Sequence, residues 1–170
     1  MNISSIIKSI IKTEKRAVER GWDKVFYFFD IHETILYPDY NNEDDLVFYP
    51  YALPVLQHLS KQDNICMCLF TCSYPKEIQR YIEFFKSHNI NFEMVNRNIE
   101  VKNNAYGYYE QKPYFNVLFE DKAGFDAEED WKDLAIYYNV MSDVEKEMIY
   151  DIRDRIDPIL PQDTYDGEPE

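Results

Sequence analysis

The hydrophobic positions at the start of the chain predict an amphipathic helix. Isoleucines recur three or four residues apart, and basic side chains fill most of the positions between them. The isoleucines are Ile3, Ile6, Ile7, Ile10 and Ile11. Such a stripe can face lipid or the protein's own sheet, and we expect it to face the sheet. Gly21 is expected to end this helix, so that residues 1–21 form one packed N-terminal element.

After this helix, short apolar runs alternate with amphipathic segments. Residues 25–29 are apolar without alternation, which is typical of a strand covered on both faces and therefore of a parallel sheet. Further strands are predicted at residues 65–70, 92–95 and 115–119. Helices are predicted at residues 51–60, 75–88 and 128–138. The alternation predicts an α/β fold with a doubly wound, mostly parallel sheet and helices on both faces.

The chain length favours a single domain. With 170 residues, the chain can bury one core and is too short for two ordinary ones. Ser142 and Glu145 have the spacing of a capping box that opens a last helix, which Pro158 should end. We therefore expect one domain over residues 1–158 and an acidic, disordered tail over residues 159–170.

The acidic residues gather in the last third of the chain. The formal net charge is −14, and residues 120–170 carry 17 acidic but only 5 basic side chains. A surface this negative repels polyanions, which makes duplex nucleic acid an unfavourable partner unless a basic pocket or a divalent cation intervenes.

The cysteines and the lack of long apolar runs indicate a cytoplasmic protein without a membrane partner. The three cysteines, Cys66, Cys68 and Cys72, are crowded into one segment, which does not suit a disulfide framework and fits a reducing compartment. No apolar run approaches the roughly 18 residues that a membrane span needs.

Polar and reactive side chains follow three of the predicted strands. In open parallel sheets, ligands bind beyond the carboxyl ends of the strands, so these positions are the candidates for chemistry. They are Asp30, His32 and Thr34 after the first strand, Thr71, Cys72 and Ser73 after the second, and Glu120, Asp121 and Asp126 after the fourth.

Three motifs together resemble the haloacid dehalogenase-like superfamily of aspartate-nucleophile phosphatases. They are DIHET at residues 30–34, an apolar strand that ends in Thr71, and EDKAGFD at residues 120–126. The strings FDIHETI and EDKAGFD are also similar to those of small phage-encoded and bacterial members. The resemblance covers about residues 23–138.

The resemblance implies a Mg²⁺-dependent phosphomonoester hydrolase. Asp30 would be the nucleophile and form an aspartyl phosphate. Mg²⁺ would be held by the Asp30 carboxylate, the backbone carbonyl of His32 and an acidic group after the fourth strand. Asp121 is the first choice for that group, while Glu120 and Asp126 can bind the ion, reach it through water or orient it.

Other residues would hold the phosphoryl group. By resemblance, the Thr71 hydroxyl bonds a phosphoryl oxygen, and Ser73 can help. A lysine is also expected, and the candidates are Lys102, Lys112 and Lys122. Lys112 precedes the fourth strand and should lie roughly 20 Å from the catalytic edge. Lys102, in the loop that leaves the third strand, ranks above Lys122.

Two residues depart from the family pattern. His32 occupies a position where the phosphatases usually have an aspartate that acts as acid and base, and histidine can also exchange protons near neutral pH. Glu33 replaces a residue that is commonly glycine and adds bulk and negative charge near an incoming phosphate. These departures motivate an alternative, a catalytically weak member of the fold that serves in binding, for example through its acidic last third.

The substrate is expected to be bulky. Residues 30–71 and 96–113 leave no room for a cap domain at either usual insertion point, so the site should be open. By resemblance, this suggests a nucleotide or macromolecular phosphomonoester, or closure of the site by another copy in a homo-oligomer. Processing of nucleic-acid ends by the same chemistry would need a basic track, of which the sequence contains little.

Overall fold

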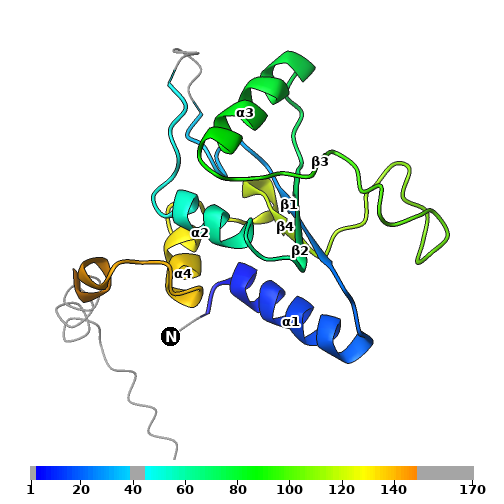
Figure 1. Cartoon of the computed structure of the whole chain (residues 1–170), viewed down its shortest axis with the longest axis horizontal. Coiled ribbons are helices and arrows are strands. Elements are labelled where there is room, and N and C mark those ends of the chain that lie inside the picture. The colour runs from blue at the N-terminus through cyan, green and yellow to red at the C-terminus, as the bar shows by residue number, and fades with distance from the viewer. Residues whose placement is uncertain (1–2, 39–44, 149–170) are drawn as a thin grey trace, which may run out of the picture. The chain divides into compact units, whose positions relative to one another are not determined.

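The computed structural model describes residues 3–38 and 45–148 (Figure 1). Its helices are α1 (Ser5–Arg20), α2 (Ala52–Leu59), α3 (Pro75–Ser87) and α4 (Asp130–Tyr137), with a 3₁₀ turn, η1, at Asp121–Ala123. Its strands are β1 (Val25–Phe29), β2 (Ile65–Leu69), β3 (Met94–Val95) and β4 (Val117–Phe119). All these elements lie where the hydrophobic pattern predicted an element of the same type, and η1 occupies the loop after the fourth strand.

The four strands form one parallel sheet in the order β3-β2-β1-β4. β1 pairs in parallel with β2 and with β4, and β2 pairs in parallel with β3. All five residues of β1 are buried, as expected for a central strand covered on both faces. The predicted parallel α/β fold is confirmed.

The N-terminal helix packs against β4 and α4 with part of its isoleucine stripe, while Ile3 and Ile11 are exposed. The Ser4 hydroxyl accepts a hydrogen bond from the Ile7 N–H at 3.5 Å, and Ile6, Ile7 and Ile10 are buried. Gly21 ends the helix at φ 64°, a left-handed conformation that glycine adopts without the steric cost of a Cβ atom.

Helices and their connections cover one face of the sheet through aromatic side chains. On this face Phe29 stacks on Phe119 with ring centroids 4.2 Å apart, and both rings lie parallel to that of Trp131 on α4. Phe85 of α3 reaches the same layer through Phe92, which contacts Phe29. This packing makes the end of β1 a rigid support for the residues that follow it.

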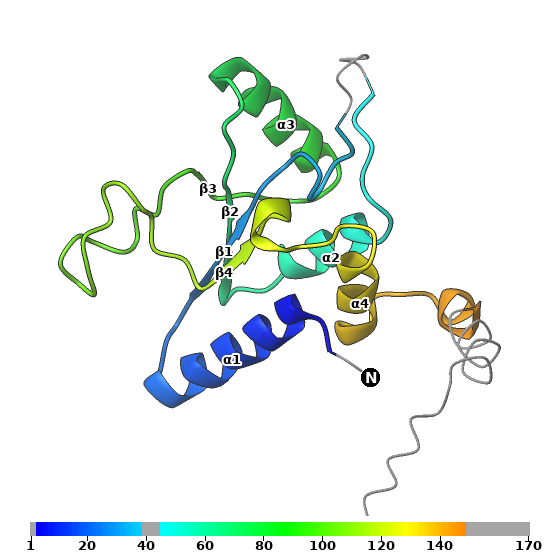
Figure 2. The same cartoon turned by 180° about the vertical axis from the view of Figure 1, so that it is seen from behind.

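The other face is covered by a loop, whereas the sequence had predicted helices on both faces of the sheet. Phe26, Phe28 and the buried cysteines of β2 form an apolar cluster on this face. Residues of the β3–β4 connection pack against the cluster, among them Tyr114 and Phe115. Figures 1 and 2 show this connection on the side of the sheet away from α2 and α4. Its asparagines, glycine and proline favour turns over a helix.

The chain divides into two compact units, residues Met1–Val140 and Met141–Glu170. In the second unit, residues 143–148 are helical, and the Glu145 carboxylate accepts hydrogen bonds from the Ser142 N–H and hydroxyl. The capping box is thus confirmed, whereas the predicted helix end at Pro158 and the tail at 159–170 lie outside the described residues. The single domain over residues 1–158 stays a prediction. Among the described helices, none is long and apolar enough to cross a membrane.

Candidate functional site

The carboxyl ends of β1 and β4 meet where the chain changes direction across the sheet. From β1 the chain proceeds through β2 to β3 on one side, and then returns to place β4 on the other side of β1. Such a switch point is where open α/β sheets bind ligands. Asp30 directly follows β1, and its N–H donates to the Phe119 carbonyl at 2.9 Å. This hydrogen bond sets Asp30 beside Glu120 and Asp121.

Three carboxylates converge at this edge. Asp30, Glu120 and Asp121 are half-buried, and one oxygen from each lies within 4.8 Å of the other two. Burial raises the pKa of the Asp30 carboxyl, and the charges of Glu120 and Asp121 raise it further. The hydrogen bond from the Ile31 N–H partly offsets this increase. The cluster concentrates negative charge at the end of a rigid strand, which favours a cation there.

The donor set suits a hard divalent cation. All three side chains offer carboxylate oxygens, the ligands that Mg²⁺ takes in proteins. Oδ1 of Asp121 is buried and has no hydrogen-bond partner among the described residues, so it retains its full capacity to bind a cation. The residues therefore fit the predicted Mg²⁺.

Thr34 joins the loops after β1 and β4. It is fully buried; its hydroxyl accepts from the Asp121 N–H at 3.3 Å, and its carbonyl accepts from Nε1 of Trp131 at 2.6 Å. One residue thus ties the Asp30 loop to Asp121 and to α4. Without these bonds, like-charged Asp30 and Asp121 would be freer to move apart.

His32 is oriented by a residue that the sequence did not single out. Nε2 of His32 lies 2.9 Å from the Tyr81 hydroxyl, and the two rings meet edge to face with centroids 5.4 Å apart. Tyr81 lies on the buried side of α3, and burial raises its pKa. In the sequence Tyr81 has the position of an ordinary core residue on a helix, so only the fold could reveal the pair.

Glu33 has the backbone conformation of a glycine. Its φ is 56°, in the left-handed region that is unfavourable for side chains with a Cβ atom. The resemblance to the phosphatases leads one to expect glycine at this position. The exposed glutamate is therefore kept there at a conformational cost.

Thr71 and Ser73 follow β2 and lie side by side. Their hydroxyl oxygens are 3.0 Å apart, and the Ser73 N–H donates to Oγ1 of Thr71 at 3.2 Å. Asn96, directly after β3, holds Thr71 by two bonds: its Oδ1 accepts from the Thr71 N–H, and its Nδ2 donates to the Thr71 carbonyl. Sequence reasoning missed Asn96, although a polar residue at a strand end was an available signal.

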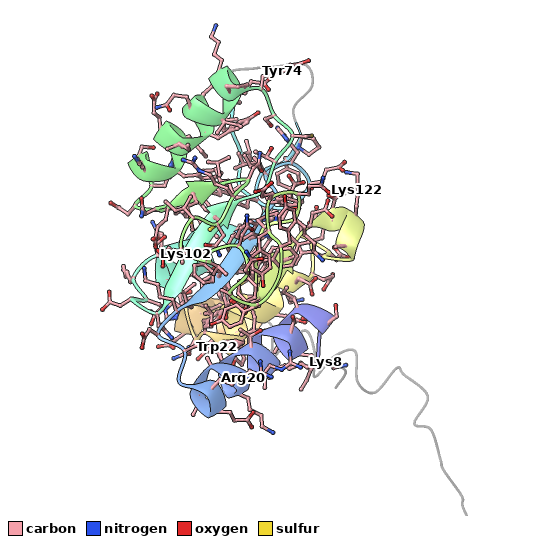
Figure 3. All side chains as sticks on the ribbon, turned by 90° about the vertical axis from the view of Figure 1, so that its right-hand side faces the viewer. Lys8, Arg20, Trp22, Tyr74, Lys102 and Lys122 are labelled. Atoms are coloured by element: carbon pink, nitrogen blue, oxygen red, sulfur yellow. The ribbon has the colours of Figure 1, made fainter. Side chains whose placement is uncertain are left out.

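Of the predicted lysines, Lys122 lies nearest to the carboxylates. Its Nζ is 3.6 Å from Oδ2 of Asp121, and the charge of Asp121 raises its pKa. Lys102 lies elsewhere: Glu100, two residues before it, bonds to Lys24 just ahead of β1. Figure 3 shows Lys102 and Lys122 well apart. The predicted ranking of Lys102 above Lys122 is therefore reversed by the geometry.

Asp126 does not join the carboxylate group. It is exposed, its Oδ1 accepts from the Glu128 N–H at 3.1 Å, and its N–H donates to the carboxylate of Asp130. These bonds assign Asp126 to the turn that leads into α4. A direct bond from Asp126 to a cation at Asp30 is not supported.

The fold and the site define a parallel α/β protein with a candidate cation site at its strand ends. No family model matches the chain, and no curated protein matches it. Among solved structures, it is similar to a conserved protein of Bacteroides thetaiotaomicron, with 16% identity, over 58% of this chain and 77% of that protein, at a TM-score of 0.47. A likeness of this degree supports no statement about function.

Proposed function

We propose that the protein is a Mg²⁺-dependent phosphomonoester hydrolase of the haloacid dehalogenase-like type that works through an aspartyl phosphate. The observation that supports this proposal is the convergence of the Asp30, Glu120 and Asp121 carboxylates at the end of the central strand. Their spacing suits one shared divalent ion, and Asp30 follows the most deeply buried strand of the sheet.

The ion would be held by the carboxylates of Asp30 and Asp121 and the backbone carbonyl of His32, with Glu120 binding directly or through water. Bound there, it would offset the repulsion between the Asp30 carboxylate and a phosphate group. Thr34 would keep Asp121 in position through the hydrogen bond that it accepts from the Asp121 N–H.

Asp30 and His32 would carry the bond changes. A carboxylate oxygen of Asp30 attacks phosphorus, the bond to the leaving alcohol breaks, and the alcohol oxygen takes a proton from Nδ1 of His32. Water then attacks the aspartyl phosphate while His32 takes up a proton, which releases inorganic phosphate and restores Asp30. Tyr81 would orient the ring through its contact with Nε2 of His32.

The remaining polar groups would bind the phosphoryl oxygens. The hydroxyls of Thr71 and Ser73 lie together after β2, the strand next to β1, and Asn96 fixes the Thr71 backbone. Lys122 would add a positive charge beside Asp121. The partner in this proposal is a phosphorylated substrate, met in the cytoplasm.

The proposal is tested by hydrolysis of an aryl phosphate with Mg²⁺ and with a chelator. We expect turnover that needs the metal and that Asp30→Asn abolishes. Asp23→Asn makes the same change at the other, amino end of β1, on an exposed residue, and should retain the activity. Equal rates in the parent and in Asp30→Asn would refute the proposal.

A second function is favoured by one observation, the strained and acidic Glu33. A protein that binds metal and phosphate without turnover would tolerate a residue that hinders the incoming phosphate. Intact Mg²⁺ binding, absent hydrolysis over a broad panel of phosphate esters and a stable protein partner would together support this alternative.

A further inference from the structure

A hollow opens beside the carboxylate cluster. Its volume is about 430 Å³, and its walls include Glu33, Tyr49, Asp121, Gly124, Asp126 and Glu128. Asp121 belongs both to this hollow and to the cluster with Asp30. A molecule whose phosphate lies at Asp30 can therefore extend into the hollow. Gly124, which also lines the hollow, ends η1 at φ 98°, a left-handed conformation that glycine adopts without steric cost.

The walls of the hollow are strongly acidic. Four of the residues that line the hollow carry carboxylates. Among its described lining residues, there is no lysine, arginine or histidine. Burial is the main cause that raises the pKa of Tyr49, and Glu128, Tyr37, Glu33 and Asp121 add to it. All three carboxylates thus act on the same wall of the hollow.

Aromatic side chains hold part of this wall in place. Tyr37 stacks on Tyr49 with ring centroids 3.9 Å apart, and the Tyr37 hydroxyl donates to Oε1 of Glu128 at 3.3 Å. Tyr49 is itself buried. Glu128 is therefore linked to a packed aromatic pair from the loop between β1 and α2, while Glu33 approaches from the loop after Asp30.

We propose that this hollow selects a phosphomonoester whose leaving group carries a positively charged ammonium group. The inference rests on the proposed function and narrows its substrate class. A divalent cation at Asp30 and Asp121, together with Lys122 beside Asp121, would offset the charge of that carboxylate, which leaves the carboxylates of Glu33, Asp126 and Glu128 in the walls of the hollow. They repel further phosphates, as in a nucleoside triphosphate, and attract an ammonium group. A short aminoalkyl chain is small enough to lie within this volume of about 430 Å³.

Two esters that differ only in this charge provide the test. In 2-aminoethyl phosphate an ammonium group replaces the terminal methyl of propyl phosphate, and the two are otherwise similar in size. We expect kcat/KM to be about tenfold higher for the aminoethyl ester, since each exposed pair adds only a small gain. The preference should shrink as salt is added, because exposed charges are screened. A ratio near one at low salt overturns the inference, whereas hydrolysis of both esters keeps the proposed function.

Variants of neighbouring residues distinguish the effect of the carboxylates in the hollow from the effect of the general surface charge. Glu128→Gln and Glu33→Gln should each lower the ratio of the two kcat/KM values by about threefold. Glu129→Gln removes the same charge one residue further on, where the side chain is 72% exposed and pairs with Lys132. This control should keep the parent's ratio. Equal losses in Glu128→Gln and Glu129→Gln would mean that bulk charge alone sets the preference, and the inference would fail.

A binding measurement decides the inference independently of turnover. Calorimetry of the parent protein in the presence of Mg²⁺ with 3-aminopropylphosphonate and with butylphosphonate, in which carbon replaces the scissile oxygen so that neither is hydrolysed, should show tighter binding of the aminopropyl compound, and Glu128→Gln should remove the difference. If the parent hydrolyses neither ester nor any aryl phosphate, the proposed function fails, while this measurement still tests the hollow. Equal affinities, or a second divalent ion that occupies the hollow and is lost in Glu128→Gln, would overturn the ammonium assignment.

Discussion

The two ends of the sheet each bring together three groups that can bind a metal, and they differ in how closely a lysine compensates the carboxylates. At the amino end, the three groups are Cys66, Glu93 and Glu100. Nζ of Lys24 lies 3.0 Å from Oε1 of Glu100, and the pKa of Lys24 is raised by Glu100 first and also by Glu93. The Lys24 ammonium thus supplies a positive charge beside this cluster.

At the carboxyl end the charge is less well compensated. The cluster of Asp30, Glu120 and Asp121 has Lys122 at 3.6 Å from Asp121, and the Lys122 side chain is 78% exposed. An ion pair so exposed to water contributes little. The two ends also differ in donors, because the hydrogen bond with Cys68 and burial raise the pKa of the Cys66 thiol and keep it protonated. Proximity of ligand-type residues is therefore a weak criterion by itself, and the two clusters differ in how closely a lysine compensates their charge.

The largest expected effect is a loss of activity that occurs in a variant at the carboxyl end of the sheet and is absent from a variant at the amino end. Asp121→Asn should lower Mg²⁺-dependent hydrolysis about a thousandfold, since a metal contributes several kcal/mol of charge stabilisation. Glu93→Gln removes a charge from the amino-end cluster and should leave the rate unchanged. The measurement is kcat/KM for an aryl phosphate at saturating Mg²⁺. Similar losses in both variants would remove the distinction between the ends.

A somewhat smaller effect is expected on stability. Mg²⁺ at about one hundred times its Kd should raise the free energy of unfolding by about 2.7 kcal/mol, because it binds only the folded chain. Asp30→Asn should remove this gain, and Glu100→Gln should retain it. Urea unfolding with and without Mg²⁺ provides the measurement. A gain that survives in Asp30→Asn would place the ion elsewhere.

A third effect, on stability and on Mg²⁺ affinity, is expected from the hydrogen bond between the Asp121 N–H and the buried Thr34 hydroxyl at the carboxyl end. Thr34→Val leaves the Asp121 N–H without its partner, so we expect a loss of about 1–2 kcal/mol in the free energy of unfolding. Mg²⁺ affinity should also fall about tenfold, since an orienting contact is lost. Thr34→Ser keeps the hydroxyl and should keep the affinity. An equal fall in affinity for both variants would assign the effect to packing.

The smallest effect is expected from Lys24, the cation at the amino end of the sheet. Lys24→Met should change the free energy of unfolding by less than about 1 kcal/mol, because the pair is exposed. The variant should gain stability on addition of Zn²⁺, as Glu93 and Glu100 lose their ammonium partner, whereas the parent should not. Equal responses of both proteins to Zn²⁺ would show that Lys24 does not act as the cation of this cluster.

The sequence predicted the elements well because their signals are local. An uninterrupted apolar run such as residues 25–29 indicates a buried strand wherever it lies in the fold. Since parallel strands end at the same edge, the sequence also indicated that Asp30, Glu120 and Asp121 would meet. It could not indicate that Asp126 would bond to the backbone of its own turn, because that depends on how the loop closes.

The sequence by itself determined the parallel α/β fold and the residues that follow each strand, since periodicity and strand ends are properties of neighbouring residues. Only the tertiary structure decided the place of Lys102, the contact between His32 and Tyr81, and the hold of Asn96 on Thr71. The connection from β3 to β4 crosses the sheet without a regular element, so its path depends on packing against Phe26 and Phe28. Contacts between residues far apart in the chain form only when the whole core is assembled, and no local pattern encodes them.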